Sequence, residues 1–485
     1  MPQSLALQSA KALASAIRRG KISSRELLDL YLARIERYNP KLNAVIAMDV
    51  EASRKRARQA DAALKKGTVW GPLHGLPMTI KESFDLIGMP TTWGLPELKD
   101  HRAERNALAV QRYIDAGAIV FGKTNVPTML ADWQTFNELY GTTNNPWDVT
   151  RVPGGSSGGS AVALAAGLTG LETGSDIGAS IHDPAHYCGV YGHKPTYDIC
   201  ATNGQALQGR VAAQDITVIG PLARSADDLE LALKIIAGPD AIDARGWRLT
   251  LPPSSKKSLR EFKVAVMLSA DTAEVDRSVQ DRIQAVADFM AKNKAKVSDT
   301  ARPDIDTAQA HRVFIHLVRA ATSGRQTDEA FARHLTAARD VKPDDTRYEA
   351  WMVKGNTMFH REWLDWNEQR HKMRLAWDRF FQDYDLLLCP AGATAAFPHN
   401  QKGERWERMV SVNGKPQPST TQMFWAGFMG MAGLPSTVAP AGLTPEGLPV
   451  GVQIVGPQYG DLTCLRLAQL LEKDYQGFVA PAGYE

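Results

Sequence analysis

The stretch Pro153–Pro184 reads PGGSSGGSAVALAAGLTGLETGSDIGASIHDP. It contains two serine clusters beside glycines, Ser156–Ser157 and Ser180. Glycine lets the backbone take positive φ and lets another group approach the main chain closely. Two glycine-flanked serine loops in one stretch predict a site built from backbone N–H groups and hydroxyls. Such a site holds a developing oxyanion while a serine attacks a carbonyl.

Outward from this stretch, predicted helices alternate with predicted strands, which favours an α/β fold with a mixed, largely internal sheet. A capping box at Ser23 and Glu26 begins one helix, which we expect Asn39–Pro40 to end. The other predicted helices cover residues 107–116, 161–168 and about 275–290, and a last one follows residue 456. The predicted strands cover residues 76–80, 118–122, 263–268 and 451–456. Residues 304–385 are rich in aromatic and charged side chains, and we expect them to form a helical insertion that walls a substrate pocket.

Bulk composition predicts a globular cytoplasmic protein. The chain has 485 residues, 44% of them apolar and 22% charged, with a formal net charge of +3. This length would allow several domains, although α/β folds also run long as one. The absence of blocks of like charge argues against nucleic acid or an anionic membrane as a partner. Four cysteines without a CxxC spacing predict no disulfide framework, and no leader or membrane-spanning segment is expected.

Three other motifs in this region are weaker candidates. The segment GSSGG at 155–159 matches G-x-S-x-G, but a nucleophile elbow needs a preceding strand, and Pro153 argues against one. No Gly-Lys-Ser/Thr follows the glycines, so a phosphate-binding loop is not expected. His182 and His186 lie near Cys188, but Pro184 between them argues against a metal-binding pair on a helix. We therefore expect structural roles for both histidines and no metal.

A serine nucleophile without an evident His–Asp pair needs another base, and Lys81 is the candidate. It ends the apolar run of Leu76, Met78 and Ile80, which is typical of a buried strand. Burial disfavours the charged ammonium, and a neutral lysine is a base. The alternative is a solvated lysine, or one paired with Glu82, and the spacing alone leaves both open.

Seven motifs in this order give the chain a resemblance to the amidase signature family of serine hydrolases. They are GLPMTIKESFD, GKTNVP, PGGSSGGS, GSDIGASIHDP, CGVYGHKPT, GPLARS and GLPVGVQIVG. The resemblance runs from the first helices to the last strand and is weakest at about 240–385 and 395–425. It implies one α/β domain over residues 1–485, with a twisted mixed sheet covered by helices.

The resemblance also implies a Ser–cis-Ser–Lys triad. Matched by motif, Ser180 is the nucleophile, Ser156 is the bridging serine in a cis peptide, and Lys81 is the base. Ser157 would support the relay. The oxyanion hole implied by the family consists of the backbone N–H groups of Ile177, Gly178, Ala179 and Ser180.

Two positions depart from the pattern of the family. The family usually has Gly-Gly-Ser where this chain has Gly178-Ala179-Ser180. The methyl group of Ala179 makes a positive φ energetically unfavourable at that position. In the family an arginine usually follows the nucleophile by two positions, and His182 occupies that position here. In the family the arginine anchors the loop through an acidic residue, to which Asp176 corresponds. A His–Asp hydrogen bond would substitute for that contact.

The resemblance implies an amide hydrolase without a cofactor, acting on a small amide, ester or carbamate (urethane). We expect a monomer or homodimer and an uncharged, partly apolar substrate held without a polar clamp. The residues expected to line its pocket are Trp133, Met423, Phe424 and Trp425.

Two alternatives to this function remain open. One is the glutaminase-like subunit of a tRNA-dependent amidotransferase, although the segment after KPTYD lacks its usual serine and arginine pattern. The other is a catalytically silent binding protein, which Ala179 and His182 would suggest.

Overall fold

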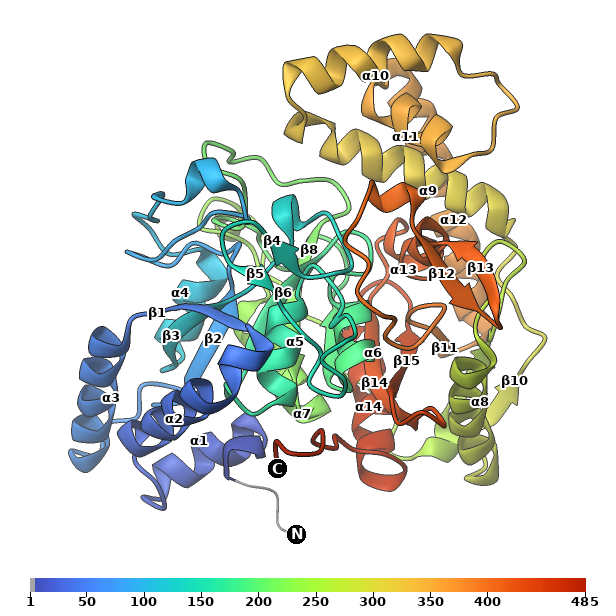
Figure 1. Cartoon of the computed structure of the whole chain (residues 1–485). Coiled ribbons are helices and arrows are strands. Elements are labelled where there is room, and N and C mark those ends of the chain that lie inside the picture. Colours follow the sequence, from blue (N-terminus) through green and yellow to red (C-terminus); the bar gives the residue numbers. More distant parts are fainter. Residues whose placement is uncertain (1–4) are drawn as a thin grey trace.

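The computed structural model of this chain describes residues 5–485. Its centre is an eight-stranded sheet in the order β10-β9-β11-β15-β14-β7-β8-β6 (Figure 1). The pairs β10–β9 and β9–β11 are parallel, and all pairs from β11 to β6 are antiparallel. The predicted α/β class with a mixed sheet is therefore confirmed. The strands of this sheet are β6 (Glu172–Asp176), β7 (Tyr191–Lys194), β8 (Val218–Ala223), β9 (Lys263–Val266), β10 (Lys296–Ser298), β11 (Leu386–Pro390), β14 (Ser436–Leu443) and β15 (Pro449–Val455).

A second, three-stranded sheet lies beside the edge strand β6. Its central strand β3 (Ile119–Thr124) pairs with β1 (Val45–Met48) in antiparallel and with β2 (Pro77–Lys81) in parallel orientation. The backbone N–H of Thr79 donates to Thr169 Oγ1 at 2.9 Å, and the Thr79 hydroxyl donates to Glu172 on β6. The contact with Glu172 holds the middle of β2 next to β6. Two short hairpins complete the strands: β4 (Phe136–Asn137) with β5 (Gly141–Thr142), and β12 (Met409–Val412) with β13 (Lys415–Pro418).

Helices surround both sheets. Those of the first two thirds of the chain are α1 (Ala10–Arg18), α2 (Ser24–Leu42), α3 (Val50–Lys65), α4 (Leu108–Asp115), α5 (Gly158–Ala165), α6 (His182–Cys188), α7 (Ala226–Ile236), α8 (Arg277–Lys292) and α9 (Thr307–Thr322). The others are α10 (Asp328–Asp340), α11 (Tyr348–Asn356), α12 (His360–Asp383), α13 (Met423–Gly430) and α14 (Asp461–Asp474). Helices α10 and α11 stand out from the sheet core at one end of the molecule (Figure 1). None of the helices within residues 5–485 is long and apolar enough to cross a membrane.

Two prolines lie inside helices, contrary to expectation. We expected Pro40 to end one helix and Pro184 to prevent another. The capping box at Ser23 and Glu26 is present, but α2 continues through Pro40 to Leu42 and ends at Asn43 in the left-handed conformation. Pro184 likewise lies inside α6. A proline in the first turn costs no hydrogen bond, because the N–H groups of that turn have no acceptor within the helix. Pro40 lies in the last turn of its helix, where the chain tolerates it.

Candidate active site

The amine of Lys81 lies at the end of β2, inside a shell of serine oxygens. The side chain has no exposed surface. Its Nζ is 2.7 Å from Ser156 Oγ, 2.9 Å from Ser157 Oγ and 3.0 Å from Ser175 Oγ. The carbonyl oxygen of Ser175 is 3.4 Å away. The structure thus brings together the three residues Lys81, Ser156 and Ser157 that the sequence analysis singled out.

Burial determines the protonation of this amine. It lowers the pKa of Lys81 from the ordinary 10.5 to about 7, although the charges of Asp176 and Asp183 favour the ammonium form. A group with this pKa is neutral in a large fraction of molecules near neutral pH. The neutral amine has a lone pair that accepts a proton from a hydroxyl beside it.

The neighbouring carboxylate does not pair with this lysine. Glu82 is fully buried, and its oxygens accept hydrogen bonds from the Thr92 hydroxyl at 2.7 Å and the Trp93 N–H at 2.9 Å. The alternative of a lysine neutralised by Glu82, which the sequence left open, is therefore wrong. The two side chains point into different hydrogen-bond networks.

The two serine loops contact each other through the backbone. The Gly155–Ser156 peptide bond is cis, and Ser157 directly precedes α5. The Ser157 N–H donates to the carbonyl oxygen of Ser180 at 3.2 Å. Glycine is required at position 155, because a Cβ there would lie 2.3 Å from the carbonyl oxygen of Asp132. This close packing fixes the loop that carries Ser156 against its neighbours.

One buried carboxylate organises the loop that carries Ser180. Asp176 Oδ1 accepts the N–H of Ala179 at 3.0 Å. Its Oδ2 accepts the N–H of Ile181 at 2.6 Å and the His182 Nδ1–H at 2.8 Å. Burial opposes the negative charge of Asp176, but the contact with His182 and these hydrogen bonds outweigh it and lower the pKa. An ionised Asp176 therefore fixes the turn between β6 and α6.

This arrangement corrects the predicted set of oxyanion donors. The Ala179 N–H already donates to Asp176, so it is not free to bind a ligand. No group within residues 5–485 accepts the N–H groups of Ile177, Gly178 and Ser180. All three residues line the same cavity. Free donors at the edge of a cavity are the arrangement that an oxyanion hole needs.

Both histidines of α6 have protein partners. His182 Nε2 lies 2.6 Å from the hydroxyl oxygen of Ser436 on β14, so its ring joins Asp176 to the main sheet. His186 Nε2 is 2.9 Å from the carbonyl oxygen of Thr394, and its Nδ1 accepts the Gly451 N–H at 2.8 Å. These contacts agree with the structural roles that we expected. Among residues 5–485, no cluster of three His, Cys, Asp or Glu side chains is placed to hold a metal ion.

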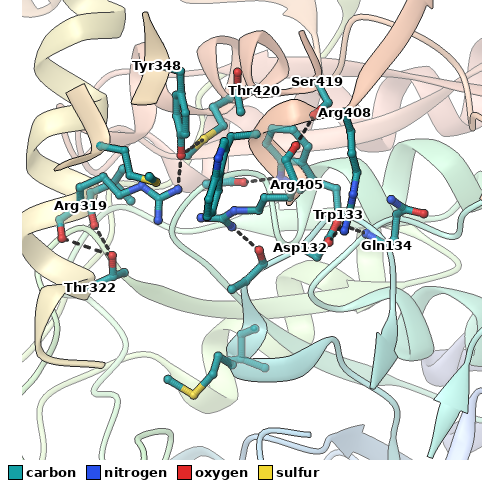
Figure 2. A pocket seen from close by; sticks show the side chains of 18 of the residues that line it. Asp132, Trp133, Gln134, Arg319, Thr322, Tyr348, Arg405, Arg408, Ser419 and Thr420 are labelled. Atoms are coloured by element: carbon teal, nitrogen blue, oxygen red, sulfur yellow. Dashed lines mark hydrogen bonds and ion pairs between the residues drawn. The ribbon is translucent and has the colours of Figure 1, made fainter. Parts of the chain in front are cut away.

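A cavity of about 260 Å³ opens beside Ser180. Figure 2 shows side chains from several distant segments pointing into it. Trp133 lines the cavity and donates from Nε1 to the carbonyl oxygen of Gly178 at 2.9 Å. The apolar part of the lining includes Leu130, Trp133, Val318, Met352, Phe397 and Met423. Helices α9 and α11 supply part of this wall, within the region from which we expected a pocket wall.

The predicted pocket residues divide into two groups. Trp133 and Met423 line the cavity, whereas Phe424 and Trp425 do not. Both of the latter are fully buried, and their rings contact each other at 5.1 Å between centroids. Consecutive residues of a helix point to different sides, so α13 turns Met423 to the cavity and the next two side chains into the core. The assignment of Phe424 and Trp425 to the pocket is therefore wrong.

The lining also has a charged part, which no sequence pattern indicates. Arg319, Arg325, Arg405 and Arg408 all line the cavity, so the expectation of a pocket without a polar clamp is wrong. Arg408 forms an ion pair with Asp132, with 2.6 Å between Nη1 and Oδ2 (Figure 2). These arginines come from two segments in which the family resemblance is weakest. No local pattern in the sequence indicates that the segments meet.

Comparison with known proteins gives consistent matches over nearly the whole chain. Residues 26–465 match the family model described as Amidase. The chain is 34% identical to an indoleacetamide hydrolase of Bradyrhizobium diazoefficiens, over 96% of this chain and 86% of that protein. It is 31% identical to a glutamyl-tRNA(Gln) amidotransferase subunit of Halorhodospira halophila, over 98% of each. A structure from a vestigial protein complex, described as revealing the origins of an s-triazine catabolic enzyme, superposes with a TM-score of 0.81. That protein is 27% identical, and the match covers 97% of this chain and 99% of the other.

We expect the activity of this site to depend on neutral Lys81. The rate should rise with pH through about 7, because the free-base fraction of the amine increases above its pKa. Lys81→Arg should lower kcat at least about 10²-fold, because an arginine cannot lose its proton at working pH. Steady-state kinetics from pH 5 to 9 check both points. Lys123→Arg, at a fully buried lysine on β3, is the control and should keep the pH profile. An active Lys81→Arg enzyme would contradict the role of Lys81.

The division of the aromatic residues predicts different effects of two substitutions. Trp425→Ala should lower the free energy of unfolding by about 3–5 kcal/mol, because it empties a core site. Trp133→Ala should cost less stability and change KM instead, because Trp133 lines the cavity. Urea denaturation and steady-state kinetics of both variants test this. Equal losses of stability with unchanged KM in both would place Trp133 in the core as well.

The backbone at Ala179 predicts a stabilising substitution. Its φ is +84°, a region in which a Cβ costs about 1–2 kcal/mol. Ala179→Gly should therefore raise the free energy of unfolding by about 1 kcal/mol, measured by urea denaturation. Ala185→Gly, in the neighbouring helix α6, is the matched control and should lower it. A loss of stability in both variants would show that the methyl group of Ala179 contributes packing that outweighs the backbone cost.

Proposed function

We propose that this chain, which belongs to the amidase family, hydrolyses the C–N bond of small amides through an acyl-enzyme on Ser180. One observation carries the assignment of the site. A fully buried amine, with its pKa lowered to about 7, lies 2.7 Å from Ser156 Oγ in a loop that contacts the loop of Ser180. The similarity to an indoleacetamide hydrolase supports a small amide as the substrate. Esters and carbamates would react by the same route.

In the first step, neutral Lys81 takes the proton of Ser156, and Ser156 takes the proton of Ser180. The oxygen of Ser180 then attacks the carbonyl carbon, and the C=O electron pair moves onto the carbonyl oxygen. The N–H groups of Ile177, Gly178 and Ser180 would bind this oxyanion. A well-aimed donor of this kind contributes about 3 kcal/mol to the stability of the transition state.

In the second step, the C–O double bond re-forms and the C–N bond breaks. The proton held by Lys81 returns through Ser156 to the leaving nitrogen, which departs as a neutral amine. Water then loses a proton to the relay, and its oxygen attacks the ester carbonyl of Ser180. The bond between the acyl carbon and the oxygen of Ser180 breaks, the relay returns the proton to that oxygen, and the carboxylic acid leaves. Lys81 is neutral at the start and at the end of each turnover.

A glutaminase-like subunit of a tRNA-dependent amidotransferase is the second candidate, and the 31% identity to such a protein favours it. Glutamine carries an α-ammonium group, which needs a carboxylate partner. Asp132 is the acidic residue of the cavity lining, and it is already paired with Arg408. The stand-alone amidase is therefore the better interpretation of the cavity. Co-purification with partner subunits from the source cell would instead support the amidotransferase.

Labelling tests the nucleophile directly. A sulfonyl fluoride should modify wild-type protein once, at Ser180, and Ser180→Ala should remove both the label and all turnover. Mass spectrometry of the digested protein locates the label. Ser157→Ala is the matched control. It should still be labelled at Ser180, since Ser157 contacts Lys81 but does not attack. A label on Ser156 or Ser157 in wild-type protein would overturn the assignment.

A further inference from the structure

We infer that the substrate carries an anionic group, most simply a carboxylate, which Arg319, Arg325 and Arg405 bind in the cavity beside Ser180. This inference rests on the proposed function, because it names the class of substrate for the same site. It goes further by assigning a charge to the substrate and a binding role to residues outside the triad.

The charges of the cavity lining do not balance. Four arginines line it, and Asp132 is the acidic residue among the lining side chains. Asp132 pairs with Arg408. Within residues 5–485, the remaining three arginines form no ion pair with a carboxylate. Three guanidinium groups therefore face one cavity without a compensating negative charge.

The hydrogen bonds of these arginines leave donors free. Arg319 donates from Nη2 to the hydroxyl oxygen of Tyr348, while its buried Nε has no partner in the described chain (Figure 2). Arg405 donates from Nη1 to the carbonyl oxygen of Ala131. Guanidinium has five N–H donors, so each side chain keeps several for a ligand. Their planar arrangement matches the two oxygens of a carboxylate.

Arg325 is held in place by neutral groups as well. Its Nη1 donates to the carbonyl oxygen of Met129 at 3.1 Å, and its Nη2 donates to the side chain of Gln214. The guanidinium carbon lies 5.1 Å from the ring centre of Trp93. Burial, and then the charge of Arg405, lower the pKa of Arg325 to about 10. The arginine is still charged at neutral pH, so its neighbours position a cation without neutralising it.

Holding like charges together in a half-buried cavity costs free energy unless an anion offsets it. A bound carboxylate would relieve this repulsion. The rest of the lining is apolar, with Trp133, Val318 and Met423 among its residues. The lining therefore fits an amide with an aliphatic or aromatic body and an acidic group. A substrate with a free ammonium group would be repelled.

Two matched substrate pairs test this inference. Glutaryl 4-nitroanilide and pentanoyl 4-nitroanilide have acyl chains of equal length that differ by a terminal carboxylate in place of a methyl group. 4-Acetamidobenzoate and 4-methylacetanilide place the same difference on the amine side. Wild-type kcat/KM should favour the acidic member of at least one pair by about tenfold or more, as one charged hydrogen bond of about 1.5 kcal/mol would give. The pair that shows the preference identifies the side of the amide that the arginines bind.

Charge-removing variants assign the preference to the arginines. Arg405→Gln and Arg319→Gln should each reduce the acidic-to-neutral ratio of kcat/KM about tenfold, mainly by raising the KM of the acidic member. Arg405→Lys should restore part of the preference. Arg333→Gln removes one charge from the exposed face of α10 and should leave the ratio unchanged. Thermal melting of each variant confirms that it is folded. An equal rate for both members of each pair in the wild type, or an equal drop in Arg333→Gln, would overturn the inference.

A binding measurement separates this inference from the proposed function. Calorimetry with glutaryl and pentanoyl 4-nitroanilide on Ser180→Ala protein reports binding without turnover. Tighter binding of the acidic ligand, lost in Ser180→Ala/Arg405→Gln, supports the inference even if the wild type hydrolyses neither compound. Hydrolysis of the neutral amide together with no preference in binding would retain the proposed function and reject the inference.

Discussion

The burial of the Lys81 amine among serine oxygens is the constraint on which the rest of the site depends. Strand β2 brings the amine to Ser156, Ser157 and Ser175, where it has oxygen partners but, within residues 5–485, no carboxylate at hydrogen-bond distance. Burial makes the ammonium form costly, so its pKa lies near 7. A neutral amine with this pKa can accept a proton from a hydroxyl near neutral pH. The three-stranded sheet and its contact with β6 hold the Lys81 amine beside these serines.

A separate hydrogen-bond network, centred on the buried carboxylate of Asp176, holds the loop that carries Ser180. Asp176 accepts three backbone N–H groups and the ring of His182, and His182 in turn contacts Ser436 on the main sheet. The same network takes up the N–H of Ala179. The loop therefore gains rigidity and keeps three other N–H groups free toward the cavity. The histidine thus makes the contact for which the family pattern uses an arginine.

The sequence predicted the fold class and the members of the site better than it predicted the cavity. Linked motifs carry Lys81, Ser156 and Ser180, because close backbone packing in these loops restricts the residue types there. The end of α2 is predicted incorrectly at Pro40. The local rule is that a proline ends a helix, but the packing of α2 carries the helix past it. The sequence assigns Phe424 and Trp425 to the pocket incorrectly. The orientation of α13 decides which of its consecutive side chains faces the cavity, and the sequence does not show that orientation. Arg319 and Arg405 come together only through tertiary structure, which no local pattern records.

The most direct test of this account is the pKa of Lys81 itself. NMR titration of protein carrying ¹³C-labelled lysine, compared with the same spectra of Lys81→Arg, isolates the Cε signal of this one residue. We expect a midpoint near pH 7 for Lys81, whereas a solvated lysine is still fully charged at that pH. A midpoint at about 10 or above would show that the amine stays protonated at working pH. Lys81 could then not be the base, and the relay through Ser156 would have to be abandoned.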